Sequence, residues 1–289
     1  MSKFAHKDIS MLTAEQIKHY HEQGFIVMDE VIPLYEIDAI KKRANSLVEQ
    51  WAEDSAGHVF TTNDNDRSDD NYFLDSAEQI KCFFEEEAFN DKRELVQDRA
   101  LCINKIGHAL HELDTVFNIF SHQKLLGDIL FDLGMKTPQI RQSMYIFKQP
   151  NIGGVVNWHQ DASFFFTTPQ SVITLWFAVE DATLENGCLW VEPAGHLGPL
   201  RERFNLEGKR TTMVNLDNMP WPTEQSGKSV EVKAGSLIVF DGLLPHYSAP
   251  NRSPKSRQAF TLHVTDGECE YAMENWLQAN TLPLRGFNR

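Results

Sequence analysis

Cysteine is scarce in this chain and is never paired at close spacing. The 289 residues include four cysteines, and no two of them form a Cys-x-x-Cys pair. They are Cys82, Cys102, Cys188 and Cys269. Single scattered cysteines exclude a disulfide-stapled scaffold and a thiolate zinc site, and they favour a reducing compartment.

Long apolar runs are also missing. No stretch approaches the roughly 20 apolar residues that a membrane-spanning helix needs, and Met1 to Met11 is too polar for a signal peptide. The last residues, 286–289, carry no peroxisomal tripeptide. We therefore expect a cytoplasmic protein without a membrane span.

Positive charge is in deficit. The chain has 27 lysines and arginines against 41 aspartates and glutamates, which gives a formal net charge of −14. Such a surface does not neutralise a phosphate backbone, so the composition argues against a nucleic-acid partner. The remaining composition, 42% apolar and 11% aromatic residues, is that of a globular protein able to bury one large core.

The start of the chain predicts helices separated by a strand. Thr13-Ala14-Glu15-Gln16 is a capping box, which predicts a short helix that ends at Gly24. A strand is predicted over 25–28, and apolar residues then recur at helical spacing over 34–51. We expect this second helix to pack flat on a sheet.

The middle of the chain is harder to interpret. Residues 53–75 are acidic and rich in amides without the spacing of a calcium loop, which predicts a solvated loop. Residues 76–89 combine a helix cap with a strand-like apolar run and fit either structure. Helices are predicted over 101–120 and 125–133. His108 and His111 lie one turn apart on the first of these, and without a third ligand nearby we expect them beside the core rather than on zinc.

Short strands separated by turns follow from Pro138 onward. They are predicted at 143–148, 172–180, 189–192, 230–232, 236–240 and 259–264. The turn Glu185-Asn186-Gly187 is typical of a hairpin. Helices in the first half and strands in the second predict an α+β fold, with N-terminal helices (about 12–134) packed on one sheet of a jelly roll, or double-stranded β-helix (about 138–276). With no internal repeat and no linker, we expect residues 1–289 to form a single domain.

A metal-binding pattern runs through the predicted strands. His159-x-Asp161 follows the strand at 143–148, and residues two apart on extended backbone project to the same side. His-x-Asp alone has little specificity, because His6-Lys7-Asp8 matches it on the polar N-terminal tail. His246 supplies a second imidazole at the end of another strand, and the three residues have the order of a facial triad for non-haem Fe(II).

The residue that makes the pattern specific is Arg257, which comes eleven positions after His246. A facial triad leaves three metal positions open, of which a 2-oxo acid can chelate two and O2 can take the third. An arginine fork on the next strand can then pair with the far carboxylate of the co-substrate. A cupin-like metal enzyme that does not use 2-oxoglutarate would not need this clamp.

The order His159-x-Asp161, His246, Arg257 resembles the phytanoyl-CoA dioxygenase family of Fe(II)- and 2-oxoglutarate-dependent oxygenases. Leu12-Thr13-x-Glu15-Gln16 and Gly24-Phe25 near the start are also similar, and the likeness runs to about Trp276. It implies a jelly-roll dioxygenase that uses Fe(II), 2-oxoglutarate and O2, with ascorbate as a supporting reductant. No residue of the triad is missing.

The resemblance also implies site residues. His159, Asp161 and His246 match the catalytic iron ligands, Arg257 matches the residue that pairs with the distal carboxylate, and Ser248 matches a hydroxyl that supports it. The remaining expected neighbours of 2-oxoglutarate are Lys105, Met144, Gln160 and Trp176. Without the resemblance, Lys105 fits an exposed helix position, and Met144 and Trp176 fit an ordinary core.

The substrate is open at this level. Residues 197–229 form a long segment with a basic run, Arg201, Arg203, Lys209 and Arg210, and end near Met219-Pro220-Trp221-Pro222. This segment fits a lid, and its basic residues fit either an anionic ligand such as a CoA ester or acidic neighbours. We expect a small-molecule or lipid-like substrate and no obligate protein partner. The rival from another class is a jelly-roll binding or scaffold protein that kept its metal pocket without turnover.

Overall fold

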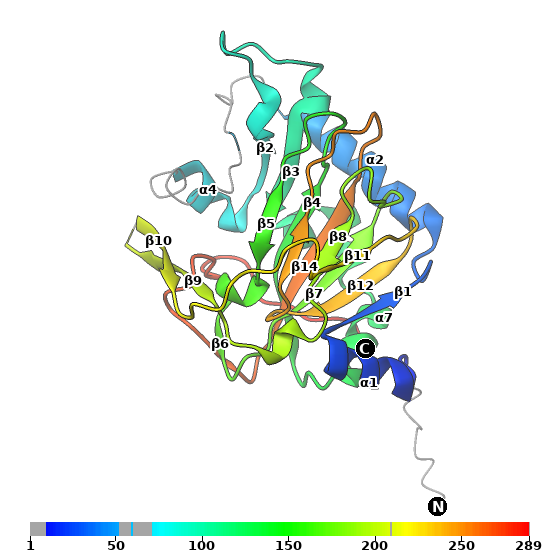
Figure 1. The fold of residues 1–289 in the computed structure, drawn as a ribbon, viewed down its shortest axis with the longest axis vertical. Helices are drawn as coiled ribbons and strands as arrows, with labels where there is room; N and C mark the ends of the chain where they lie inside the picture. Colours follow the sequence, from blue (N-terminus) through cyan, green and yellow to red (C-terminus); the bar gives the residue numbers. More distant parts are fainter. Residues whose placement is uncertain (1–9, 52–58, 60–70, 209, 289) are drawn as a thin grey trace, which may run out of the picture.

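A computed structural model describes residues 10–51, 59, 71–208 and 210–288 of the chain. Two sheets built from antiparallel strand pairs dominate it (Figure 1). The larger sheet has, in spatial order, β1 (Phe25–Met28), β12 (Leu237–Asp241), β7 (Ile173–Ala178), β14 (Ala259–Asp266), β4 (Pro138–Ile146), β3 (Ile103–His108) and β2 (Ile80–Phe84). The smaller sheet has β11 (Lys228–Val230), β8 (Leu189–Val191), β13 (His246–Ser248) and β5 (Val156–His159).

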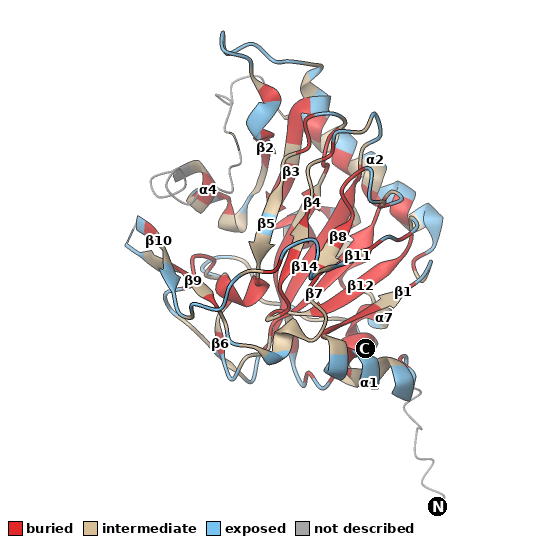
Figure 2. Cartoon of the chain, in the orientation of Figure 1, coloured by how far each residue is buried: buried red, intermediate tan, exposed pale blue. Residues whose placement is uncertain are grey.

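Helices cover one face of the larger sheet. They are α1 (Ala14–Gln23), α2 (Leu34–Gln50), α5 (Leu110–Leu113), α6 (Thr115–Ser121) and α7 (Lys124–Asp132). The apolar side of α2, including Ile40 and Ala44, shares one buried cluster with Leu175 of β7 and Phe260 of β14. Figure 2 shows the result, with the central strands buried and the outer side of α2 exposed. None of the described helices is both long and apolar enough to cross a membrane.

The opposite face of the larger sheet contacts the smaller sheet. Trp176 of β7 and Ile238 of β12 belong to a second buried cluster with Leu189 and Val191 of β8. Two facing sheets with helices on the outside form the jelly roll of an α+β fold, as the sequence predicted. Alternate residues of β7 and β14 therefore point either to the helices or to the space between the sheets.

Shorter elements connect these layers. They are α4 (Asn71–Asp75), η1 (Ser76–Glu78), η2 (Glu86–Ala88), η3 (Arg99–Cys102), η4 (Asp161–Ser163), β6 (Thr167–Thr168), η5 (Gly195–Leu197), the hairpin β9 (Glu202–Glu207) and β10 (Arg210–Asn215), and β15 (Glu270–Tyr271). The ambiguous segment 76–89 resolves into the short helical turn η1, the strand β2 and the turn η2. Of the predicted acidic loop, residues 53–58 and 60–70 lie outside the described residues, and 71–75 form helix α4 instead.

Several predicted elements are confirmed. Thr13 caps α1 with the full capping box, and Gly24 ends the helix at φ 84°, a conformation that glycine adopts without strain. β1 occupies the predicted residues, and α2 has the predicted start. α7 is followed by Gly134 at φ 96°.

The helix predicted over 101–120 is wrong in its first half. Residues 103–108 form β3, which pairs with β2 on one side and β4 on the other. These pairings satisfy the backbone of both β3 edges, and they outweigh a local helical periodicity. Lys105 therefore lies on a strand and is buried, not on an exposed helix surface.

The hairpin predicted at Glu185-Asn186-Gly187 is also wrong. A turn is present, and Gly187 has a φ of 84°. The strands on either side do not pair with each other, because β7 pairs with β12 and β14 while β8 pairs with β11 and β13. The turn carries the chain from one sheet to the other, and local turn chemistry does not distinguish that crossing from a hairpin.

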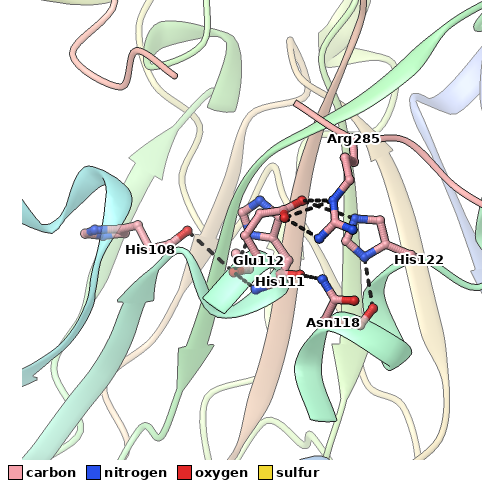
Figure 3. Close-up of polar contacts among 7 residues, drawn as sticks. His108, His111, Glu112, Asn118, His122 and Arg285 are labelled. Carbon is pink, nitrogen blue, oxygen red and sulfur yellow. Dashed lines mark hydrogen bonds and ion pairs between the residues drawn. The ribbon is translucent and has the colours of Figure 1, made fainter. Parts of the chain in front are cut away.

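A buried polar cluster lies where the C-terminal segment meets α5 and α6. Arg285 donates from Nε to both oxygens of Glu112, at 3.0 Å each, and also from Nη2 (Figure 3). The Nε2 of His122 lies 3.4 Å from the same carboxylate, whose side chain is only 3% exposed. His111 lies beside this group, and its Nδ1 is 2.9 Å from the hydroxyl of Ser143.

The two histidines that were considered for zinc do not share a site. Figure 3 shows the side chain of His108 directed away from that of His111. The Nδ1 of His108 is 2.7 Å from the Ser76 hydroxyl, so each imidazole has a different serine partner. The expectation of buried histidines beside the core is met, since both are at most 4% exposed.

His111 gives the fold a specific acid sensitivity. Burial, with smaller contributions in the same direction from the neighbouring His122 and Arg285, lowers the pKa of His111 to about 3. The unfolded chain has an ordinary histidine there, with a pKa of about 6.5. Below that pH His111 is protonated in the unfolded state but stays neutral in the folded state. The free energy of unfolding therefore falls as the pH falls from 6.5 toward 3.

We expect the pKa difference of His111 to lower the free energy of unfolding by about 2 kcal/mol as the pH falls from 7 to 5. The measurement is the free energy of unfolding in urea at both pH values for the wild type and for His111→Asn, which keeps a polar atom near the Ser143 hydroxyl. The wild type should lose about 2 kcal/mol more than the variant over this interval. Equal losses would show that His111 is not held neutral.

Candidate metal centre

Two histidines meet across the smaller sheet. His246 of β13 pairs directly with His159 of β5, and their rings lie 4.1 Å apart between centroids. Each Nδ1 contacts a backbone carbonyl two residues earlier, Asn157 O at 2.8 Å and Leu244 O at 3.0 Å. A carbonyl can only accept, so both Nδ1 atoms carry the proton and both Nε2 lone pairs are free to bind a metal.

Asp161 completes the group from outside the strands. It is the first residue of the turn η4, and its Oδ1 lies 3.6 Å from His159 Nε2 and 3.7 Å from His246 Nε2. Among the described residues this is the one set of three metal-binding side chains whose ligand atoms lie within 4.8 Å of one another. The sequence predicted His159 and Asp161 side by side on extended backbone, whereas the strand ends at His159 and the turn brings the carboxylate back.

The protonation states of these groups suit a metal. Burial alone would raise the pKa of Asp161, but the imidazoles of His263 and His246 hold it well below its usual value. Burial, reinforced by His159, lowers the pKa of His246 to about 4. At neutral pH the centre therefore offers an ionised carboxylate and a neutral imidazole, which are the ligating forms.

Arg257 lines the same cavity as the triad. It is 1% exposed, and its Nη2 and Nε donate to Ser248 Oγ at 3.0 Å and Gly187 O at 3.1 Å. Its Nη1 is buried and has no hydrogen-bond partner within the described chain. Burial lowers the pKa of Arg257 to about 10, so the group is still a cation at neutral pH. A buried guanidinium with a free N–H is suited to an anionic ligand.

The cavity that joins the triad and Arg257 has a volume of about 560 Å³. Its wall includes four more of the predicted residues, namely Lys105, Met144, Trp176 and Ser248. The Nζ of Lys105 lies 3.9 Å from Met144 Sδ, and Arg257 lies 5.5 Å from the centre of the Trp176 ring. β3, β4 and β7 thus bring these predicted residues into one space.

Gln160 is placed differently. Its amide nitrogen donates to Pro199 O at 3.1 Å and Leu243 O at 2.7 Å, and its oxygen accepts from Arg201 N at 2.9 Å. The side chain therefore ties three loops together and is not part of the cavity wall. Gln160 lies between His159 and Asp161 in the sequence, but its side chain points away from the cavity into which theirs point.

Sequence reasoning missed several residues of the cavity. Aromatic side chains from separate segments complete the wall: Phe73, Phe164, Phe165, Trp221 and Trp276. Thr174 and His263 also line it. Thr174 is the one polar residue of β7, whereas His263 belongs to a polar series, Thr261, His263 and Thr265, that alternates with apolar residues in β14. The isolated threonine and this alternation were the signals in the sequence that could have identified them.

The long segment 197–229 contributes to the cavity through Glu202, Met213 and Trp221. Two of its arginines are engaged with acidic side chains, Arg201 with Glu192 at 2.7 Å and Arg203 with Glu274 at 3.1 Å. Of the two interpretations of this basic run, these contacts favour the one in which arginines balance acidic neighbours. Lys209 lies outside the described residues.

Comparison with known proteins assigns this geometry to a family. The family model for phytanoyl-CoA dioxygenase (PhyH) matches residues 20–259. The chain belongs to the phytanoyl-CoA dioxygenase family. A "Phytanoyl-CoA dioxygenase" of Arabidopsis thaliana is 43% identical over 275 residues, which cover 94% of this chain and 95% of that protein. "Phytanoyl-CoA dioxygenase domain-containing protein 1" of Danio rerio is 35% identical over 283 residues, which cover 94% of this chain and 96% of that protein.

Solved structures show the same fold. EctD from S. alaskensis, solved with 2-oxoglutarate and 5-hydroxyectoine, has a TM-score of 0.64 at 18% identity, with 97% of this chain and 86% of EctD covered. SnoK, an alpha-ketoglutarate-dependent carbocyclase, has a TM-score of 0.62 at 16% identity, with 94% and 96% covered. A phytanoyl-CoA dioxygenase family member with an intact His-Asp-His group is an oxidoreductase of the Fe(II)- and 2-oxoglutarate-dependent dioxygenase class.

Proposed function

We propose that His159 Nε2, Asp161 Oδ1 and His246 Nε2 hold Fe(II), and that Arg257 holds 2-oxoglutarate by its distal carboxylate. The observation that carries this assignment is the buried Nη1 of Arg257, which has no hydrogen-bond partner among the described residues and shares a cavity with the triad. When bound, the iron supplies the activation of O2 that couples decarboxylation of 2-oxoglutarate to oxidation of a C–H bond. The products are the hydroxylated substrate, succinate and CO2.

The chain's own residues bind and orient the reactants. Ser248 accepts a hydrogen bond from Arg257 and donates to Gly187 O at 2.8 Å, so it fixes the guanidinium fork. Lys105, Met144 and Trp176 line the same cavity as this clamp and the triad, and we assign them to the 2-oxoglutarate pocket. Enclosure by these side chains excludes water from the reacting groups.

We propose a small, largely apolar substrate. Aromatic side chains, including Phe164, Trp221 and Trp276, line the cavity together with the triad and the clamp. Arg201 and Arg203 are already paired with acidic residues, and the described residues of this segment that line the cavity are Glu202, Met213 and Trp221. We further propose that 197–229 closes over the substrate, that ascorbate keeps the iron reduced, and that the chain works in the cytoplasm as one domain without an obligate protein partner.

The test is succinate formation from 2-oxoglutarate by the purified protein with Fe(II), O2 and ascorbate. We expect slow turnover even without the substrate, together with loss of turnover in His159→Ala. His19→Ala, which changes an exposed histidine of α1, is the matched control and should keep the wild-type rate. Absence of succinate, combined with no thermal shift on addition of 2-oxoglutarate, would favour the non-catalytic binding protein instead.

A further inference from the structure

Only one oxygen of Asp161 faces His159 and His246, and the other oxygen contacts Thr174 and His263. The hydroxyl of Thr174 donates to Asp161 Oδ2 at 2.5 Å. The Nε2 of His263 lies 3.4 Å from the same oxygen. Oδ1, in contrast, is the atom that lies between His159 Nε2 and His246 Nε2. The two oxygens of this carboxylate therefore have separate neighbours.

The register of the larger sheet creates this arrangement. Thr174 of β7 lies directly opposite His263 of β14, so their side chains emerge together on the same face. The next residues along these strands, Leu175 and Leu262, also pair, and they point to the helix side and belong to the buried cluster there. A shift of either strand by one residue would place an apolar residue opposite the remaining polar one and so break this pair.

The ring of His263 has little freedom to move. It stacks on Phe165 with centroids 4.8 Å apart and 26° between the planes, and it is 3% exposed. Its Nδ1 is buried with no hydrogen-bond partner within the described chain, whereas Nε2 faces Asp161. The imidazole can therefore donate to the carboxylate only through Nε2.

Asp161 needs such support because of where it lies. It begins a short turn rather than continuing β5, so the strand does not fix the direction of its side chain. A free carboxylate can bind a metal through both oxygens, and the second oxygen would then take a position that 2-oxoglutarate or O2 requires. Two donors on Oδ2 oppose that rotation.

We propose that Thr174 and His263 are positioning residues that hold Asp161 in one-oxygen ligation and so keep three metal positions open. This inference rests on the proposed function, because it concerns the same metal. Neither residue touches the metal or the substrate in this account, and both act through the direction of the Asp161 carboxylate.

The test uses variants that remove or keep each donor. Thr174→Val removes the hydroxyl at nearly constant shape, and Thr174→Ser keeps it. His263→Phe removes the donor and keeps a ring to stack on Phe165, and His263→Gln keeps an amide donor near the position of Nε2. The metal is Co(II), whose affinity is measured by calorimetry and whose absorption spectrum reports its coordination number, both without turnover.

We expect Thr174→Val and His263→Phe each to bind Co(II) about 10- to 100-fold more weakly than the wild type. The Co(II) absorption should change in shape. Thr174→Ser and His263→Gln should recover most of the wild-type affinity. Melting temperatures of the metal-free proteins separate these effects from misfolding, and if His263→Phe does not fold, the Thr174 pair decides alone.

The outcomes distinguish this inference from the proposed function. A wild type that binds no Co(II) and forms no succinate would remove the proposed function itself. If the wild type binds Co(II), and Thr174→Val and His263→Phe bind it with the same affinity and the same spectrum, then Thr174 and His263 do not position Asp161. The proposed function would be unaffected by that result.

Discussion

Replacing Asp161 with alanine should lower succinate formation by on the order of 10³-fold and prevent stable iron binding. The physical reason is the loss of the only charged ligand, since His246 stays neutral down to a pH of about 4. Two imidazoles alone bind a divalent ion much more weakly than two imidazoles and a carboxylate. The measurement is iron content after gel filtration together with the rate of succinate formation.

The control for this variant is Asp38→Ala. Asp38 lies on the exposed side of α2, far from the cavity wall, so the substitution removes the same group without touching the site. Circular dichroism should show both variants folded. An Asp161→Ala protein that kept its iron and its rate would mean that the metal is held elsewhere.

Replacing Arg257 with alanine should raise the KM for 2-oxoglutarate about 100-fold, which corresponds to about 3 kcal/mol of lost charge-assisted hydrogen bonding. Arg257 is 1% exposed, so water does not screen its contact with a bound carboxylate. Iron binding should be unchanged, because the guanidinium does not contact the triad. The measurement is the dependence of succinate formation on 2-oxoglutarate concentration.

Arg252→Ala is the matched control on the same loop. Arg252 pairs with Glu87 on the surface, where its side chain is 54% exposed. Its loss should leave the KM for 2-oxoglutarate at the wild-type value, and Arg257→Lys should lie between the two because a lysine supplies charge without the fork. If Arg257→Ala kept the wild-type KM for 2-oxoglutarate, Arg257 would not bind the co-substrate.

The sequence alone predicted those features that depend on the order of residues along the chain and on patterns within a few residues. His159, Asp161 and His246 were identified because two histidines and a carboxylate followed predicted strands in the order of a facial triad. The capping box at Thr13 and the glycine at position 24 located α1, because capping is chemistry within a few residues. The jelly roll followed from helices gathered before a run of short strands.

The remaining features depend on pairing between distant segments. Residues 103–108 looked helical and became β3 because β2 and β4 flank them. Thr174 and His263 lie far apart in the chain and meet only through the register of β7 with β14, which no local pattern fixes. Gln160 was expected to face the co-substrate, and its contacts with the loops at Pro199 and Leu243 turn it away.

The most direct test of the proposed iron and 2-oxoglutarate site is an anaerobic titration of the Fe(II)-loaded protein with 2-oxoglutarate, followed by addition of O2. We expect a metal-to-ligand charge-transfer absorption that saturates at one 2-oxoglutarate per protein, is lost in Asp161→Ala, and disappears with O2 as succinate forms. A protein that binds iron but develops no such absorption, and forms no succinate after O2 is added, would contradict it.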